Sequence, residues 1–122
     1  MNRDAMAPKR YHKIDSEAIL DQASEHSMHE PVVLFKHSVR CGISHRARRE
    51  IEQLTQDDDP PVYEVVVQDA RSLSNKIAEE FDIQHQSPQV IVLYQRQPIF
   101  DASHGRVTAQ AVRAVVENAI TS

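Results

Sequence analysis

One run of apolar residues constrains the fold of this chain more than any other feature of its sequence. Residues 32–35 read Val-Val-Leu-Phe, with no polar residue among them. A run this short and rich in β-branched residues is typical of a strand buried on both faces, whereas a strand with one wet face alternates apolar and polar residues. Strands of that kind occur where helices cover both sides of a sheet, so the run predicts an α/β protein.

Helical and strand patterns alternate along the rest of the chain. Apolar spacings of three and four predict helices over residues 16–25, 42–54 and 73–81, and a last helix after residue 108. β-rich runs predict strands over residues 62–67, 89–94 and 99–102, the last two as an antiparallel hairpin. In the second helix Ile43, Ala47, Ile51 and Leu54 form the expected inward stripe. The expected N-caps are Asp15, Ser72 and Thr108, with a flexible turn at Gly105.

Size and composition fit one globular domain. The chain has 122 residues, of which 40% are hydrophobic and 26% charged, and this length supports a single core. We expect a loose tail over residues 1–10 and one domain over residues 11–122. A formal net charge of -4 argues against nucleic acid as a partner, because phosphate binding needs surplus cations. The longest apolar run is far below the roughly 20 residues of a membrane span, and we see no export signal, so we expect a cytoplasmic protein that does not span a membrane.

The single cysteine, Cys41, lies between the buried run and the second helix. Its thiol falls at or near the helix N-cap, where the free backbone N–H groups of Ile43 and Ser44 favour a thiolate, as does the helix dipole. Lys36 and Arg40 add positive charge nearby, in a segment, residues 36–49, that holds five Lys or Arg and no Asp or Glu. A buried, inert cysteine is the alternative. The cationic setting favours a reactive thiol, since a core cysteine gains nothing from such neighbours.

Other polar residues near Cys41 have possible roles in its chemistry. Ser44 follows three residues later on the same helix face, so we expect its hydroxyl to donate a hydrogen bond to the sulfur, although it cannot resolve a disulfide. His37 and His45 flank the thiol; they could move protons, but we expect both to be ordinary exposed residues. The seven histidines contain no pairing typical of a closed metal site, so we expect no metal.

Several separated motifs resemble a known family. Strand, Cys41-Gly42-Ile43-Ser44, helix, and later Ser87-Pro88 before a strand resemble the thioredoxin fold with its C-x-x-C reduced to C-x-x-S. The chain is more closely similar to the monothiol bacilliredoxin (YtxJ-like) family. The motifs that carry this likeness are Phe35-Lys36-His37-Ser38, Cys41 with Ile43-Ser44, Ser74-Asn75 with Ile77-Ala78-Glu79, His85 with Ser87-Pro88-Gln89-Val90, and Ala102-Ser103-His104 before Thr108.

The resemblance implies a fold and an activity. It implies a thioredoxin-like α/β fold with a central four-stranded mixed sheet flanked by helices. It implies that Pro88 is cis and faces Cys41, that Ser87 offers its backbone to an extended substrate, and that His104 belongs to the substrate site. The implied reaction is the removal of bacillithiol, or a related small thiol, from protein mixed disulfides through Cys41. Bacillithiol is then a co-substrate, no cofactor is tightly bound, and we expect a monomer.

A second reading starts from the same four residues. Cys41-Gly42-Ile43-Ser44 is also similar to the C-G-F-S of monothiol glutaredoxins, some of which share an iron-sulfur cluster between two chains. A cluster held by thiolates needs four ligands, so one cysteine per chain requires a dimer and two external thiols. The Gly-Gly-x-Asp stretch that holds glutathione in those proteins is replaced here by Ser103-His104-Gly105-Arg106. Thiol exchange is therefore the favoured function.

Overall fold

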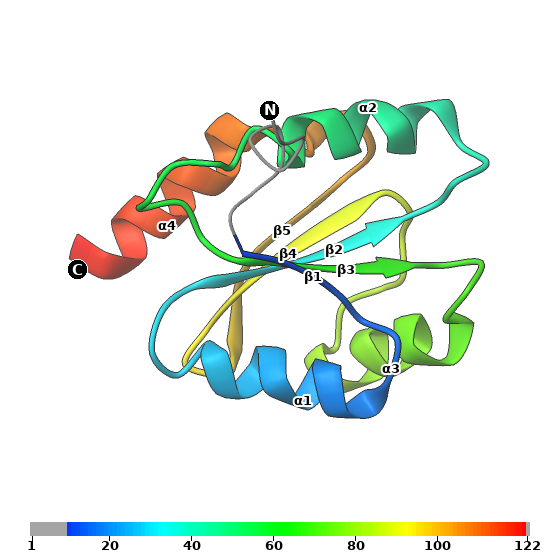
Figure 1. Ribbon diagram of the computed structural model, residues 1–122, viewed down its shortest axis with the longest axis horizontal. Helices are drawn as coiled ribbons and strands as arrows, with labels where there is room; N and C mark the ends of the chain where they lie inside the picture. The colour runs from blue at the N-terminus through cyan, green and yellow to red at the C-terminus, as the bar shows by residue number, and fades with distance from the viewer. Residues whose placement is uncertain (1–9, 122) are drawn as a thin grey trace, which may run out of the picture.

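A computed structural model of the chain describes residues 10–121 (Figure 1). Except for Arg10, the tail expected over residues 1–10 lies outside the described residues. In chain order the elements are β1 (Tyr11–Lys13), α1 (Glu17–His26), β2 (Val32–His37), α2 (Gly42–Ile51), β3 (Val62–Val66), α3 (Arg71–Phe81), β4 (Gln89–Tyr94), β5 (Gln97–Ser103), the 3₁₀ turn η2 (His104–Arg106) and α4 (Ala109–Thr121).

The strands form one mixed sheet in the order β1-β3-β2-β4-β5. β3 pairs parallel with both β1 and β2, whereas β4 is antiparallel to β2 and to β5. The sheet has five strands, so the expected count of four is wrong. The additional strand is β1, whose three residues, Tyr-His-Lys, are too few and too polar to show a strand pattern in the sequence.

Helices cover both faces of the sheet, as the buried run predicted. Figure 1 shows α2 and α4 on one face and α1 and α3 on the other. β2 divides its side chains between two cores: Val33 and Phe35 pack on the α2 and α4 side, and Val32 and Leu34 on the α1 and α3 side. None of these four side chains is more than 1% exposed. The double burial expected of this strand is therefore confirmed.

Two of the three expected helix caps are wrong. The side chain of Ser16 accepts a hydrogen bond from the Ile19 N–H, so Ser16 rather than Asp15 caps α1. α3 begins at Arg71 with Ala70 at its N-cap position, which places Ser72 inside the first turn as an exposed residue. The third expectation is confirmed, because the Thr108 hydroxyl accepts from the Ala111 N–H at 3.1 Å.

The hairpin between β4 and β5 has a shorter turn than expected. Tyr94 pairs with Gln97, so the turn consists of Gln95 and Arg96 alone. Both have positive φ, 53° and 64°, as a two-residue type I′ turn requires. The pairing is irregular further along, since Val92 pairs with Phe100 and Leu93 with Pro98. One extra residue, Ile99, therefore lies between two paired positions of β5.

Asp59 and Arg113 join α4 to the loop before β3. Asp59 Oδ1 accepts from Arg113 Nε at 2.9 Å and Oδ2 accepts from Nη2 at 3.0 Å. The carboxylate is 5% exposed, and it also accepts the Gln56 N–H. Although burial opposes it, the hydrogen bonds from Arg113 and Gln56 hold the pKa of Asp59 below its usual value.

No helix within residues 10–121 combines the length and apolar character that crossing a membrane would demand.

Candidate active site

Cys41 is the N-cap residue of α2. Its backbone is extended, with φ -114° and ψ 123°, and its carbonyl accepts the His45 N–H at 3.1 Å. The side chain is half-buried and the thiol is free. The following N–H groups, including those of Ile43 and Ser44, belong to the helix start that has no intrahelical partners. The thiol therefore lies where the sequence predicted, beside the donors expected to favour a thiolate.

Ser44 points inward, and its hydroxyl is hydrogen-bonded to residues other than Cys41. It is fully buried, and its hydroxyl oxygen accepts from the Ser38 N–H at 2.8 Å. The same oxygen lies 2.9 Å from His37 Nδ1. Burial, followed by the charges of Arg48 and His45, lowers the pKa of His37 to about 4, so its ring is neutral. Contrary to our expectation, the Ser44 hydroxyl is hydrogen-bonded to Ser38 and His37, and within residues 10–121 no hydrogen bond joins it to the Cys41 sulfur.

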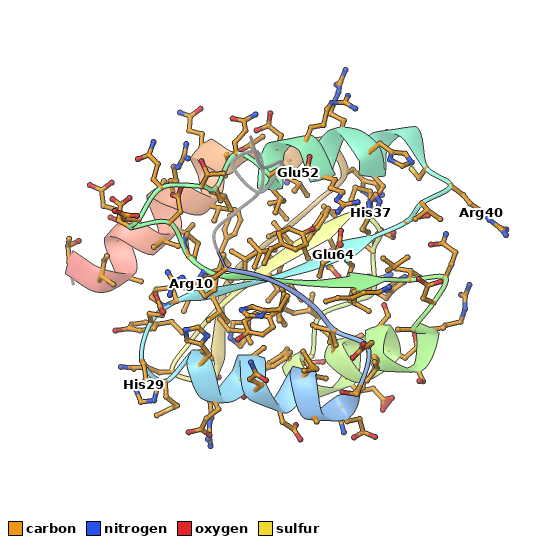
Figure 2. The ribbon with its side chains drawn as sticks, viewed as in Figure 1. Arg10, His29, His37, Arg40, Glu52 and Glu64 are labelled. Atoms are coloured by element: carbon orange, nitrogen blue, oxygen red, sulfur yellow. The ribbon has the colours of Figure 1, made fainter. Side chains whose placement is uncertain are left out.

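His37 was expected to be exposed, and this prediction is wrong. It is 1% exposed because β2 extends two residues beyond the apolar run, which places His37 on the same face as Phe35, with which it stacks. Figure 2 shows His37 on the side of the sheet that faces α2. His45 is exposed as predicted, and its Nε2 donates to the Val39 carbonyl. The two rings meet edge to face at 5.2 Å.

The two cations expected to stabilise the Cys41 thiolate, Arg40 and Lys36, lie in different surroundings. Arg40 is exposed in the turn between β2 and α2, and its side chain extends away from the molecule (Figure 2). Lys36 is 1% exposed and lies on the α1 and α3 face, opposite to α2, because side chains alternate along a strand. Its Nζ contacts His85 Nδ1 at 3.1 Å, and burial lowers the pKa of Lys36 to about 8. The structure therefore separates Lys36 from the thiol it was expected to stabilise.

A buried carboxylate lies under α2. The Glu64 side chain is 6% exposed, and its Oε2 is 3.5 Å from Arg48 Nε. Arg48 Nε is equally far from Glu52 Oε2, and its guanidinium lies over the Tyr11 ring. Burial raises the pKa of Glu64, while the charge of Arg48 opposes the rise. Figure 2 shows Glu64 on the same side of the sheet as His37, so α2 covers polar side chains of the sheet as well as apolar ones.

The peptide bond between Ser87 and Pro88 is cis, as the resemblance implied. Pairing of β4 with its neighbours starts at Gln89, so Ser87 lies outside the ladder. The Ser87 hydroxyl is buried and has no hydrogen-bond partner within residues 10–121. The backbone of Ser87 is therefore outside the strand pairing, and its pairing with an extended substrate stays a prediction.

His104 lies beside the cis-proline. Its N–H donates to the Pro88 carbonyl at 3.0 Å, and its exposed side chain follows the end of β5. The sharp turn here uses a positive φ of 56° at His104, whereas Gly105 has no positive φ. The turn expected at Gly105 is therefore made one residue earlier. The structure brings His104 and Pro88 together, while the contact of Pro88 with Cys41 and of both residues with a substrate stays a prediction.

Within residues 10–121, no three side chains of His, Cys, Asp or Glu gather in a way that could hold a metal ion.

Solved structures and a family show what this arrangement is similar to. An oxidoreductase described as putative, with a thioredoxin fold, is 25% identical and covers 88% of this chain and 94% of its own, with a TM-score of 0.79. A thioredoxin variant from Halobacterium salinarum NRC-1 is 15% identical, covers 92% of each chain and has a TM-score of 0.71. Thioredoxin f from spinach chloroplast is 13% identical, covers 98% of this chain and 99% of its own, and has a TM-score of 0.70.

The fold and the site therefore define a thioredoxin-fold redox protein with one thiol at the start of α2. The family model described as monothiol bacilliredoxin BrxC matches residues 12–112. The chain belongs to the monothiol bacilliredoxin family.

Proposed function

We propose that the protein is a monothiol oxidoreductase that removes bacillithiol, or a related small thiol, from mixed disulfides on other proteins. The observation that carries the proposal is the position of Cys41 at the N-cap of α2, half-buried and unpaired. A sulfur held there is near donors that stabilise negative charge. Family membership supports the redox chemistry, and the Ser87 backbone, which lies outside the strand pairing, supports a protein chain as the substrate.

The reaction has two steps in which bonds and electrons balance. The Cys41 thiolate attacks the small-thiol sulfur of the mixed disulfide, and the electron pair of the broken S–S bond leaves on the substrate protein's sulfur, which takes a proton from solvent. Cys41 now carries the small thiol. A second small thiol, as thiolate, attacks this adduct, releases Cys41 and leaves as a disulfide of two small thiols. The second small thiol is oxidised, the first stays at the disulfide level throughout, and the substrate protein is reduced to its thiol.

Ser44 accounts for the need for an external thiol. It occupies the fourth position of C-x-x-S, where other proteins of this fold type place a second cysteine, and its hydroxyl is hydrogen-bonded to His37. A serine cannot attack the adduct. We propose that the protein acts as a monomer in a reducing cytoplasm, where small thiols are plentiful.

The stoichiometry of the adduct tests this mechanism. Exposed to a small disulfide, the parent protein should retain one equivalent on Cys41 by intact mass, and Cys41→Ser should retain none and lose turnover. Ser44→Cys should release the small thiol without added reductant and form an internal disulfide, because both residues lie in one helical turn. Ser24→Cys, with its second thiol on α1, is the matched control and should keep the adduct. Turnover by Cys41→Ser would show that another group is the nucleophile.

A shared iron-sulfur cluster is the alternative use of the same sulfur. It predicts a coloured dimer after anaerobic purification, with iron bound and lost in Cys41→Ser. Thiol exchange predicts a colourless protein that reacts as described above. A visible absorption spectrum combined with iron analysis decides between them.

A further inference from the structure

A groove runs between α2 and the segment that follows β5. α2 contributes Arg46 and Arg49 to one wall, with Gln53 just after the helix, and the opposite wall contains His104 and Thr108. The groove encloses about 550 Å³, within the range of about 300–1,000 Å³ typical of small-molecule sites. We name it the α2–η2 groove.

The net charge of this groove is positive, and its two arginines are free of ion pairs within residues 10–121. Within the part of the chain that the structure describes, neither Arg46 nor Arg49 forms an ion pair, in contrast to Arg48, Arg96 and Arg113. The acidic residue of the groove, Glu50, accepts the Ala109 N–H at the start of α4 through Oε1 and keeps its negative charge, so two cations face one anion in the groove. A chain with a net charge of -4 thus keeps two free guanidinium groups together in a hollow. This pattern indicates an anionic ligand.

The groove adjoins the candidate active site at both walls. On one wall, Arg46 follows Cys41 by five residues, about 7.5 Å along the helix axis, and Arg49 by about 12 Å. On the other wall, the His104 N–H is bonded to the carbonyl of the cis-proline, Pro88. A ligand whose sulfur is at Cys41 therefore reaches the arginines with charged groups roughly two to three residues' length away.

We propose that the α2–η2 groove binds the carboxylate groups of the small thiol while its sulfur reacts at Cys41. This inference rests on the proposed function and adds to it a binding subsite, formed by Arg46 and Arg49, for the carboxylates of the small thiol. Arginine suits the task because its planar guanidinium pairs with a carboxylate through two hydrogen bonds. The substrate protein's own chain lies at Ser87, on the backbone before the cis-proline, so the two halves of a mixed disulfide occupy different places.

The test compares disulfides that differ in charge. Second-order rates of Cys41 thiolation are measured by intact mass or stopped flow, using glutathione disulfide as the anionic probe and 2-hydroxyethyl disulfide as the neutral one. Arg46→Gln with Arg49→Gln should slow the anionic probe about tenfold and leave the neutral probe within about twofold. Lys76→Gln with Arg96→Gln removes the same charge from other surfaces and should change neither rate. Added salt should slow the anionic probe in the parent far more than in the groove variant.

The outcomes separate this inference from the proposed function. If the groove variant reacts with the anionic probe at the parental rate, or if both probes slow equally, the groove does not bind carboxylates, although thiol exchange at Cys41 stands. If the parent protein is thiolated by neither probe, the proposed function fails first. If Lys76→Gln with Arg96→Gln slows the anionic probe as much as the groove variant does, net charge alone is responsible and the groove is not a site.

Discussion

The hydroxyl of Ser44 shows how a single residue's partners decide its role. Spacing alone placed it on the thiol's side of the helix, because residues three apart share a face. In the structure it is hydrogen-bonded to His37, a histidine that we expected to be exposed. Both errors have one cause: the sequence does not reveal that β2 continues through Lys36 and His37, since polar residues rarely occupy a strand buried on both faces.

The depressed pKa of His37 makes stability depend on pH in a defined window. The unfolded ring, with a pKa of about 6.5, takes up a proton before the folded ring, with a pKa of about 4. The unfolded state therefore binds more protons as the pH falls between these values, and the free energy of unfolding decreases, by up to about 3 kcal/mol from this group. The contribution is fully present above about pH 6.5.

Replacing His37 with glutamine tests this dependence. The amide of the new side chain can still form a hydrogen bond with Ser44, but it does not titrate, so urea unfolding of His37→Gln should show a shallower loss of stability from about pH 6.5 to about pH 4. His29→Gln, at an exposed position after α1, should keep the parental slope. A parental slope in His37→Gln would assign the acid sensitivity to other groups.

At the scale of elements, the first position of α2 holds a residue, Gly42, that is not the most stabilising one for a helix start. Gly42 is the first residue of the helix, its φ is not positive, and a Cβ placed there meets no atom within 4 Å. Proline suits this position because its fixed φ is helical and the missing N–H has no intrahelical partner. The extended backbone of Cys41 also suits the residue before a proline.

We therefore expect Gly42→Pro to stabilise the protein by about 0.5–1 kcal/mol, raising Tm by a few degrees in a thermal scan. Gly42→Ala should stabilise it too, since glycine costs more backbone entropy than alanine. The alkylation rate of Cys41 should stay within about twofold of the parent in both variants if the N–H groups of Ile43 and Ser44 are the ones that favour the thiolate. A large fall in the alkylation rate of Cys41 in Gly42→Pro alone would show that the Gly42 N–H is the group that favours the thiolate.

Elements with strong periodicity were predictable and short or irregular ones were not. α4 and the hairpin strands follow their patterns, and Thr108 caps as expected. β1 could not be predicted, because three residues are too few to show the alternation of a strand. Its pairing with β3 is also a long-range contact, which the local sequence does not reveal. On α2, Ile43 was assigned inward by its spacing, yet it is 50% exposed while Ser44 is buried. Ser44 can be buried because its hydroxyl has hydrogen bonds to His37 and Ser38, and a buried hydroxyl needs such partners.

At the scale of the whole molecule, the buried pair Asp59–Arg113 connects the last helix to the rest. Asp59→Asn keeps the shape but removes the charge, leaving Arg113 with a weaker partner. We expect a loss of about 2 kcal/mol in the free energy of unfolding, measured by urea denaturation. Asp58→Asn, next to it but exposed, should cost little.

Val112 and Val116 of α4 belong to the same core as Val33 and Phe35, so the loss should appear as one shifted transition rather than as early melting of α4. The thiolation rate of Cys41 should not change in Asp59→Asn, because the pair lies outside the candidate active site. A separate early transition would show that α4 is held by this pair alone.

The extra residue in β5 has a consequence for how this protein meets other copies of itself. β5 and β1 are the two edges of the sheet, and an exposed edge is a template on which foreign strands can add and aggregates can grow. β1 offers only three residues. β5 is longer, but Ile99 bends it in the middle and Pro98 beside it has no N–H to donate. A second chain can follow neither edge for long, and the sheet is thereby protected against edge-to-edge growth.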